Sequence, residues 1–289
     1  MNISVIIPFY NDYETIGETL ESLAQQSHSV YEVIIVDDFS NNEKEVENAI
    51  SDYKSILPLR LLRNNQNKNG AYSRNRGIMN SRGDIIAFLD ADDTWMPNKT
   101  QRMIQFVNKY GLERLFFSKV NIDVNGLSNF SRPKGFNSKV HISEYLFLED
   151  GFIQTSSIFC GSNIAKEVLF QEHFKRHQDY DFVLRAYHKG VKFQFIPEEL
   201  VTYKSALKVN LSKGESYEYS RSWANEMKVY FSDSGFSGFQ IFNLTSRLLA
   251  EKRYGKAVIN LFHGLVNLRI NDYSRIYPKL KRTIKGVLK

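Results

Sequence analysis

The stretch Phe88-Leu89-Asp90-Ala91-Asp92-Asp93 decides how the rest of this sequence is interpreted. It follows Asp84-Ile85-Ile86-Ala87, so an apolar run typical of a buried strand ends in three carboxylates within four residues. Clustered carboxylates resist desolvation, and as hard oxygen ligands they suit Mg²⁺ or Mn²⁺. Asp92-Asp93-Thr94 is equally typical of a cap for a helix with Pro97 in its first turn. The stretch alone therefore predicts either a metal site or a helix cap.

The length and composition are those of a globular protein with one large α/β core, or with one domain and an appendage. The chain has 289 residues, of which 42% are hydrophobic and 24% charged. Its single cysteine, Cys160, has no partner for a disulfide, which favours a reducing compartment such as the cytosol. The first residues lack a basic n-region, and no run approaches about 18 apolar residues. We therefore expect neither a signal peptide nor a transmembrane helix.

The net charge of +6 is unevenly distributed. Residues 246–289 carry eleven Lys or Arg and two acids, a net of +9, whereas the remainder carries 27 basic and 30 acidic residues, a net of −3. A basic segment of this kind suggests contact with nucleic acid or phospholipid headgroups, and a solvated helix face is the alternative. Nucleic-acid binding is the weakest of these predictions, because no recognition motif accompanies the charge.

Strands and helices alternate up to residue 110. We predict strands at 3–7, 32–36, 59–62 and from Asp84, and helices at 13–26, 43–54 and 72–81. This order predicts a parallel, doubly wound sheet, whose ligands bind at the carboxyl ends of the strands. Three polar clusters, 8–12, 37–38 and 90–93, lie at those ends. Their coincidence favours one functional site over three unrelated turns.

Two common nucleotide-binding motifs are missing from the sequence. The turn after the first strand, residues 8–12, contains no glycine, so a dinucleotide-binding Rossmann domain is not expected, and there is no Walker A motif. Arg74 and Arg76 lie near the start of the 72–81 helix, where guanidinium groups and backbone donors favour phosphate. Solvation at the surface is the alternative for both, and more so for Arg76.

Five segments together resemble family-2 glycosyltransferases, which have the GT-A fold. They are IIPFYN at 6–11, VDDFS at 36–40, GAYSRNRG at 70–77, GDIIAFLDADD at 83–93 and QDYDFVLR at 178–185. The resemblance covers about residues 1–205 and implies a Rossmann-like, doubly wound mixed sheet with a helical C-terminal extension. It implies a nucleotide-sugar-binding half at 1–110, an acceptor-binding half at 111–205, and a loop with basic amphipathic helices at 206–289.

The resemblance also implies an activity and its donor site. Members of this family are inverting enzymes that move a sugar from a nucleotide diphosphate, most often UDP, to an acceptor hydroxyl. A divalent cation, Mn²⁺ or Mg²⁺, stabilises the departing diphosphate as a Lewis acid. The donor-site residues implied are Asp92 as metal ligand, Asp90 on the ribose or metal, Asp38 on the uracil N–H, Pro8 and Tyr10 around the nucleoside, and Arg74 on the nucleotide or phosphate.

The expected catalytic base lies in the second half of the chain. Inversion needs a carboxylate that takes the proton of the acceptor hydroxyl. In the family a Glu-Asp pair begins this helix and its Asp is the base, and here the pair is Gln178-Asp179. Asp179 is therefore the expected base and Asp181 the fallback, although a charge at a helix N-terminus worth about 0.3–1 kcal/mol is the alternative role.

Three further residues are weaker candidates for the site. His173 and His177 flank the start of the same helix, where either would complete a metal shell or simply be solvated. Lys204 is the third candidate. The Gln-x-x-Arg-Trp motif of processive synthases is absent, since the nearest sequence, Arg221-Ser222-Trp223, has the wrong spacing. This absence predicts transfer of one sugar per encounter.

The C-terminal part offers a loop and an amphipathic helix. Ser205 to Tyr219 is rich in Ser, Lys and Gly, typical of a mobile loop that closes over the donor, or of a linker. An apolar stripe at helical spacing and a basic run follow: Tyr254, Ala257, Val258, Leu261, Phe262, Leu265 and Val266, then Lys279, Lys281, Arg282, Lys285 and Lys289. Docking of the stripe on the catalytic domain is the favoured use, and contact of the basic end with anionic lipid, worth ~1 kcal/mol per cation, is the other.

These observations predict a bacterial-type, non-processive glycosyltransferase that adds one hexose or N-acetylhexosamine to a surface glycan such as an O-antigen or capsule. A polyprenyl diphosphate carrier and the cytoplasmic face of the membrane are expected from the resemblance and the basic tail. Two alternatives remain. One is a sugar-phosphate nucleotidyltransferase, which would need a Gly-rich, basic N-terminal loop, and the other is a non-catalytic nucleotide-sugar binder, against which Asp90, Asp92 and Asp179 argue.

Overall fold

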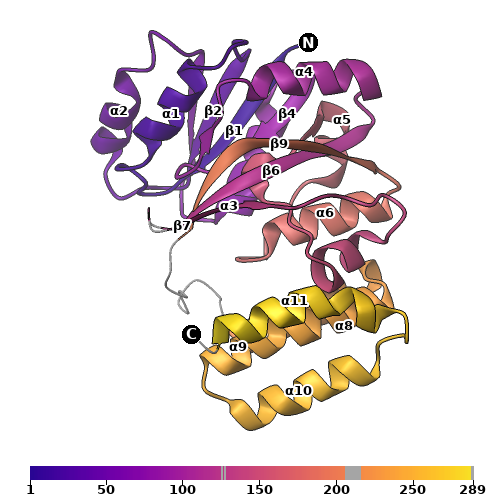
Figure 1. Ribbon diagram of the computed structural model, residues 1–289. Coiled ribbons are helices and arrows are strands. Elements are labelled where there is room, and N and C mark those ends of the chain that lie inside the picture. The colour runs from indigo at the N-terminus through magenta and orange to yellow at the C-terminus, as the bar shows by residue number, and fades with distance from the viewer. Residues whose placement is uncertain (125, 127, 206–215, 288–289) are drawn as a thin grey trace.

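The computed structural model describes residues 1–124, 126, 128–205 and 216–287 of the chain (Figure 1). The strands of this part are β1 Ile3–Phe9, β2 Glu32–Asp37, β3 Leu59–Arg63, β4 Ile85–Phe88, β5 Thr94–Trp95, β6 Arg114–Val124, β7 Ser128–Arg132, β8 Phe159–Gly161 and β9 Lys192–Ser205. The α-helices are α1 Ile16–Ala24, α2 Glu43–Ser51, α3 Gly70–Asn80, α4 Lys99–Tyr110, α5 Ser162–Val168, α6 Gln178–His188, α7 Tyr217–Glu226, α8 Asp233–Phe239, α9 Thr245–Ala250, α10 Tyr254–Val266 and α11 Asp272–Val287. Short helical turns are η1 Glu144–Leu148, η2 Thr155–Ser157, η4 Met227–Tyr230 and η5 Gln240–Leu244.

One mixed sheet organises the chain up to β9. Its strand order is β3-β2-β1-β4-β8-β6-β9-β5, with β7 paired to β6. The first four strands are parallel, as the alternation of strands and helices predicts, while β8 runs antiparallel between β4 and β6. In register, Phe9 lies opposite Asp37, and Asp37 opposite Arg63. The carboxyl ends of β1, β2 and β3 therefore meet at one edge of the sheet.

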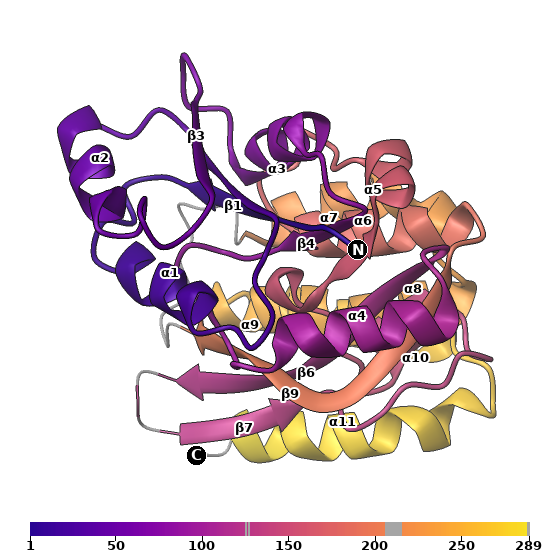
Figure 2. The same cartoon turned by 90° about the horizontal axis from the view of Figure 1, so that it is seen from above.

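Alternating side chains divide the core between the two faces of the sheet. Ile6, Phe88 and Phe117 pack with α3, α5 and α6, whereas Val5 and Ala87 pack with α1, α2 and α4. Figure 2 shows these helix groups on opposite sides of the strands. Burial on both faces explains why the strands are apolar runs without polar alternation. The predicted fold class, a doubly wound mixed sheet with a helical C-terminal extension, is confirmed.

The helix-cap interpretation of Asp92-Asp93-Thr94 is wrong. Thr94 and Trp95 form the short strand β5, which pairs with β9, and the next helix begins only at Lys99. Asn98 precedes that helix and makes no side-chain cap hydrogen bond. The carboxylates thus belong to the loop between β4 and β5, because pairing with a strand far along the chain overrides the local preference for a cap.

The C-terminal helices form a layer below the sheet (Figure 1). Arg275 of α11 joins this layer to η1, donating to Glu144 at 2.7 Å and to Glu149 at 2.9 Å. The expected loop at 205–219 falls mostly on residues outside the described part, and α7 already begins at Tyr217. No helix in the described ranges is long and apolar enough to cross a membrane.

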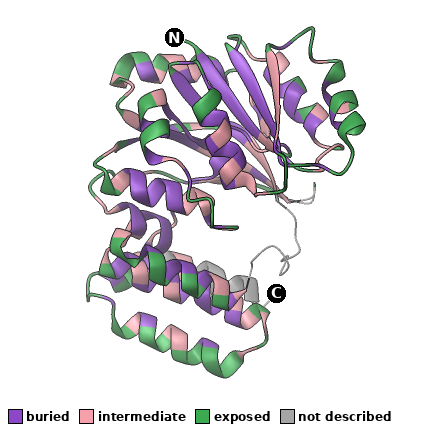
Figure 3. Cartoon of the chain, turned by 180° about the vertical axis from the view of Figure 1, so that it is seen from behind, coloured by how far each residue is buried: buried purple, intermediate pink, exposed green. Residues whose placement is uncertain are grey.

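The expected docking of the apolar stripe of α10 on the catalytic domain is wrong for one of its faces. Ala257 and Gly264 are buried and α10 packs on α8, η5 and α9, where a Cβ on Gly264 would lie only 2.6 Å from Ile241. The opposite face is open to solvent, as the lowest helix of Figure 3 shows in green. The exposed apolar side chains of α10 are Tyr254, Val258, Ile259, Phe262 and Val266.

Candidate active site

The carboxylates that follow β4 occupy distinct environments. Asp92 is exposed, Asp90 is partly exposed, and Asp93 is completely buried. Ser156 of η2 holds this loop from below, since its Oγ accepts the backbone N–H of Asp90 at 2.9 Å and donates to Asp93 at 2.5 Å. Two carboxylates thus face outward above a third that anchors the loop.

Asp93 is the anchor that sequence reasoning missed. Its carboxyl accepts from Gln154 Nε2 at 2.7 Å and from the backbone N–H of Lys204 at 3.2 Å. Burial, reinforced by the negative charges of Asp90 and Asp92, raises the pKa of Asp93 well above its ordinary value. Asp93 therefore ties β9 and the segment before η2 to the acidic loop. The sequence signal available for it was only its place at the end of an acidic run.

Arg74 links the donor side of the site to the acceptor side. From α3 it donates to Asp90 Oδ1 at 2.5 Å and to Gln178 Oε1 at 2.7 Å, the first residue of α6. Arg74 is 7% exposed, and a Cβ on Gly70 would lie 3.0 Å from its Nη1 atom. Glycine at position 70 thus leaves room for the guanidinium to bridge the acidic loop and the start of α6, although Gln178 is 104 residues from Arg74 in the sequence.

Asp179 occupies the first turn of α6, beside Gln178. It is partly buried, and burial raises its pKa to about 6, against the opposing effects of the Tyr180 backbone N–H and the positive charge of Arg74. Asp181, the fallback base, is fully buried and accepts two hydrogen bonds from Arg185, at 2.6 and 2.7 Å. The geometry therefore favours Asp179 over Asp181 as a proton acceptor.

The expected uridine contacts lie around the ends of β1 and β2. Asp38 is buried and accepts from the backbone N–H groups of Lys68 and Asn69 and from the amide of Asn64, at 2.7 to 3.1 Å. These bonds give Asp38 a structural role in shaping the loop after β3. Pro8 is partly buried, and Tyr10 is 44% exposed beside it. An exposed aromatic ring next to buried polar groups suits a stacked base.

The side chains of the remaining candidates make their contacts outside this constellation. His173 pairs with Glu226 at 2.7 Å, and His177 bonds to Ser220 at 3.0 Å and packs against Trp223, with ring centroids 4.7 Å apart. Burial lowers the pKa of His177 to about 3, so this side chain is neutral and structural. Lys204 reaches Glu18 of α1 with its ammonium group. Arg76 is likewise structural, since it donates to the carbonyl of Arg63 and to Asn64.

The residues present fit a divalent cation only together with a ligand. Among the described residues, no group of three or more His, Cys, Asp or Glu side chains is arranged to hold a metal. Asp90 and Asp92 are nevertheless close enough to Asp93 to raise its pKa, and both reach the surface. Such hard oxygen ligands suit Mg²⁺ or Mn²⁺ when the oxygens of a diphosphate and water complete the shell.

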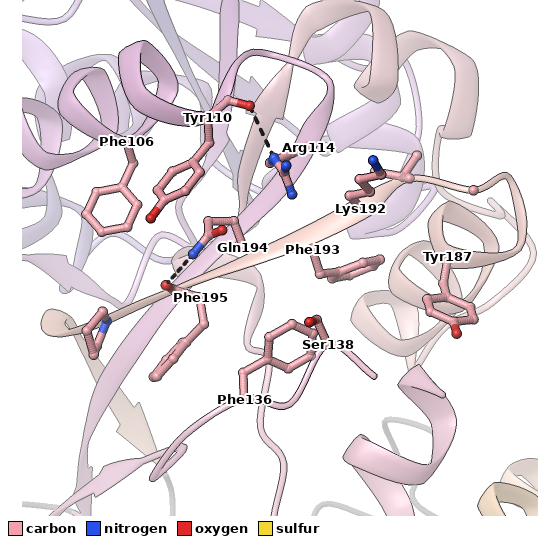
Figure 4. A pocket seen from close by; sticks show the side chains of 13 residues that line it. Phe106, Tyr110, Arg114, Phe136, Ser138, Tyr187, Lys192, Phe193, Gln194 and Phe195 are labelled. Carbon is pink, nitrogen blue, oxygen red and sulfur yellow. Dashed lines mark hydrogen bonds between the residues drawn. The ribbon is translucent and has the colours of Figure 1, made fainter. Parts of the chain in front are cut away.

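A pocket of about 930 Å³ lies elsewhere on the molecule (Figure 4). Aromatic side chains of α4, α6 and β9, among them Phe106, Tyr187 and Phe195, line it. The sequence-predicted site residues described above are not part of its lining. Pocket size therefore does not identify the functional site. The candidate site is identified by its chemistry, the acidic loop after β4 with Asp179 at the start of α6.

A mixed sheet of the GT-A type, a surface acidic loop after β4 and a carboxylate at the start of α6 are the features expected of a glycosyltransferase. Comparison with known proteins agrees, because the model of the glycosyl transferase family 2 matches residues 4–163. The chain belongs to this family. The predictions of family, fold and glycosyltransferase activity are thereby confirmed, and this decides against a nucleotidyltransferase.

Several characterised relatives are similar over most of the chain. The amylovoran biosynthesis glycosyltransferase AmsB of Erwinia amylovora is 37% identical over 297 residues, 99% of each chain. The UDP-Glc:alpha-D-GlcNAc-diphosphoundecaprenol beta-1,3-glucosyltransferase WfaP of Escherichia coli is 31% identical over 66% of this chain and 72% of its own. The crystal structure of S. aureus TarS 1-349 in complex with UDP-GlcNAc has a TM-score of 0.68 at 19% identity, and the match covers 97% of this chain and 85% of that one.

Proposed function

We propose that this protein is a metal-dependent, inverting, non-processive glycosyltransferase that transfers one sugar from a UDP donor to a hydroxyl of a lipid-linked surface glycan. The observation that carries the proposal is the bridge from Asp90 through Arg74 to Gln178, the neighbour of Asp179. It fixes an acceptor-side carboxylate relative to the acidic loop that receives the donor. Inversion requires such an arrangement, with base and leaving group on opposite sides of the sugar.

Each residue has a defined task in this reaction. A cation held by Asp90 and Asp92 supplies Lewis-acid stabilisation of the diphosphate when it is bound. Arg74 adds a fixed positive charge beside Asp90. The exposed ring of Tyr10 supports the nucleobase of the donor. Asp179, with a pKa of about 6, is ionised at neutral pH and takes the proton from the attacking hydroxyl.

The named activities of relatives support the donor and acceptor classes. WfaP uses UDP-glucose and a diphosphoundecaprenol-linked acceptor, and TarS binds UDP-GlcNAc. AmsB is a glycosyltransferase of amylovoran biosynthesis. By analogy we assign to this chain a UDP-hexose or UDP-N-acetylhexosamine donor and a polyprenyl-diphosphate-linked glycan acceptor.

Contact with the cytoplasmic leaflet is part of the proposal. The open face of α10 carries Val258, Phe262 and Val266, each more than 60% exposed, and exposed Lys256 and Arg269 lie in or near the same helix. Apolar side chains beside cations are typical of a surface that rests on anionic lipid. A membrane-bound acceptor would then be presented to a peripheral enzyme.

The first experiment measures release of free nucleoside diphosphate from a panel of UDP-, GDP-, CDP- and dTDP-sugars without acceptor. We expect slow release from one UDP-sugar with Mn²⁺ and none with chelator. The Asp92→Asn variant should lose this release, while the control Asp52→Asn, at an exposed position directly after α2, should keep it. If no donor is hydrolysed and nucleotide binding does not depend on metal, the non-catalytic binder becomes the better interpretation.

A further inference from the structure

A second pocket lies between the sheet-containing part and the C-terminal helices. Its volume is about 400 Å³, within the range of ligand pockets in proteins. It is built from elements far apart in the chain: the end of β7, η1 and the loop after it, α6, η5, α9 and α11. Side chains of the catalytic domain and of the C-terminal helices thus form its walls together.

The lining of this pocket is strongly cationic. Arg132, Arg247 and Lys279 contribute to it, and none of the described lining residues is Asp or Glu. Neutral polar residues, Tyr180, Asn243 and Ser246, accompany the cations. Three cationic side chains with neutral polar residues around one cavity favour an anion with several oxygens, such as a phosphate or diphosphate ester.

Contacts within the pocket fix the cations in place. Arg132 donates to Asp150 at 2.6 Å and lies over the Phe152 ring at 5.0 Å. Lys279 donates to the carbonyl of Phe147 at 3.0 Å and lies over the Phe242 ring at 4.6 Å. Held on aromatic faces, both side chains lose little further freedom when an anion binds.

Two chain segments connect this pocket to the active site. Tyr180, which lines it, directly follows Asp179, and the charges of Arg132 and Arg247 act on the pKa of the Tyr180 hydroxyl, which burial raises. Phe152, on another wall, lies two residues before Gln154, which bonds to Asp93. The pocket therefore adjoins the acceptor side of the site, away from Asp38 and Tyr10.

We propose that this pocket binds the phosphate or diphosphate ester of the acceptor through Arg132, Arg247 and Lys279. The inference rests on the proposed function, because it assigns a place to the anionic part of the acceptor that the enzyme uses. It also gives the C-terminal helices a role in substrate recognition, since two of the three cations belong to α9 and α11.

The test is calorimetric titration with inorganic pyrophosphate and with farnesyl diphosphate, in chelator so that no metal holds the anion at Asp90 and Asp92. The double variant Arg247→Gln/Lys279→Gln is expected to bind both about 100-fold more weakly, roughly tenfold for each charged donor removed. The matched control, Arg82→Gln/Lys166→Gln, removes the same charge from exposed positions outside the pocket and should bind as the unaltered protein does.

The assignment would be overturned by the absence of pyrophosphate binding to the unaltered protein, by equal binding to the pocket variant, or by equal loss of binding in the control. If Arg74→Gln were the only variant to lose pyrophosphate binding, the anion would bind on the donor side, and this result would also overturn the assignment. Arg247→Gln by itself, expected to weaken binding about tenfold, covers the case in which loss of the Lys279 bond to Phe147 unfolds α11.

Tighter binding of farnesyl diphosphate than of pyrophosphate indicates a lipid-linked ester, and equal binding indicates recognition of the anion alone. Donor hydrolysis by the unaltered protein tests the proposed function separately.

Discussion

Asp179 can accept a proton only while its carboxyl group is ionised. Because burial raises its pKa to about 6, kcat/KM is expected to be constant above that pH and to fall about tenfold per pH unit below it. Asp179→Asn removes the base and should lower transfer by roughly 10²–10⁴-fold while donor binding persists. The measurement is the pH profile of kcat/KM between pH 5 and 8, with nucleotide binding measured alongside.

The stability of the Asp179→Asn variant provides its control. A carboxyl group with a folded-state pKa above its unfolded value of about 3.8 binds protons more tightly in the folded protein, so its ionisation weakens folding as pH rises through that interval. The neutral amide should therefore leave the unfolding midpoint at pH 7 unchanged or higher. An active variant, or a profile that stays flat down to pH 5, would place the base elsewhere.

Gln178 is the residue at which this chain departs from the Glu-Asp pair of its family. In Gln178→Glu, a second carboxylate adjoins Asp179 and disfavours its ionisation, although Arg74 shares part of the new charge. The acid limb of the pH profile should therefore shift upward, by about half to one pH unit. Gln101→Glu, exposed on α4, is the control. A downward shift would show that Arg74, and not the like charge, dominates at Asp179.

At the scale of elements, Arg275 anchors the C-terminal layer through three acids. It contacts Glu144 and Glu149 of the catalytic domain and Asp272 of its own helix, all partly or fully buried. Arg275→Leu leaves these charges uncompensated and should lower the free energy of unfolding by about 2–4 kcal/mol, as measured in urea. Lys54→Leu removes an exposed pair with Glu47 and should cost much less. Equal losses would contradict a special role for the Arg275 cluster.

How far the sequence predicts each element depends on whether its determinants are local. The strands β1 to β4 lie within about two residues of their predicted bounds, because apolar runs between polar turns define them. β5 was missed because its partner is β9, more than 100 residues away. His177 was misjudged for the same reason, since most of the aromatic side chains around it come from α7 and α8, far along the chain. Asp179 was predicted through the family resemblance, and its raised pKa depends on tertiary burial.

At the scale of the whole molecule, each face of the C-terminal layer has a separate proposed role. One side closes the cationic pocket next to α6, and the other presents the apolar face of α10 to solvent. A lipid-linked acceptor carries a glycan, a diphosphate and a lipid in the same order as the active site, the cationic pocket and the apolar face of α10. We therefore propose that the carboxylates of the site, the cationic pocket and the exposed face of α10 contact successive parts of one substrate.

This order predicts that α10 brings the protein to anionic membranes. Flotation with vesicles containing phosphatidylglycerol should recover the unaltered protein, and vesicles of phosphatidylcholine alone should recover less, because each nearby cation adds ~1 kcal/mol. Val258→Glu/Phe262→Glu should abolish recovery, since it removes two exposed apolar side chains from the contact and adds two negative charges. Ile56→Glu, at a position that is 61% exposed in the turn before β3, is the control and should float normally. Flotation of the α10 variant at the unaltered level would refute lipid contact through this face, and because its substitutions lie outside the pocket lining, its pyrophosphate binding should be retained.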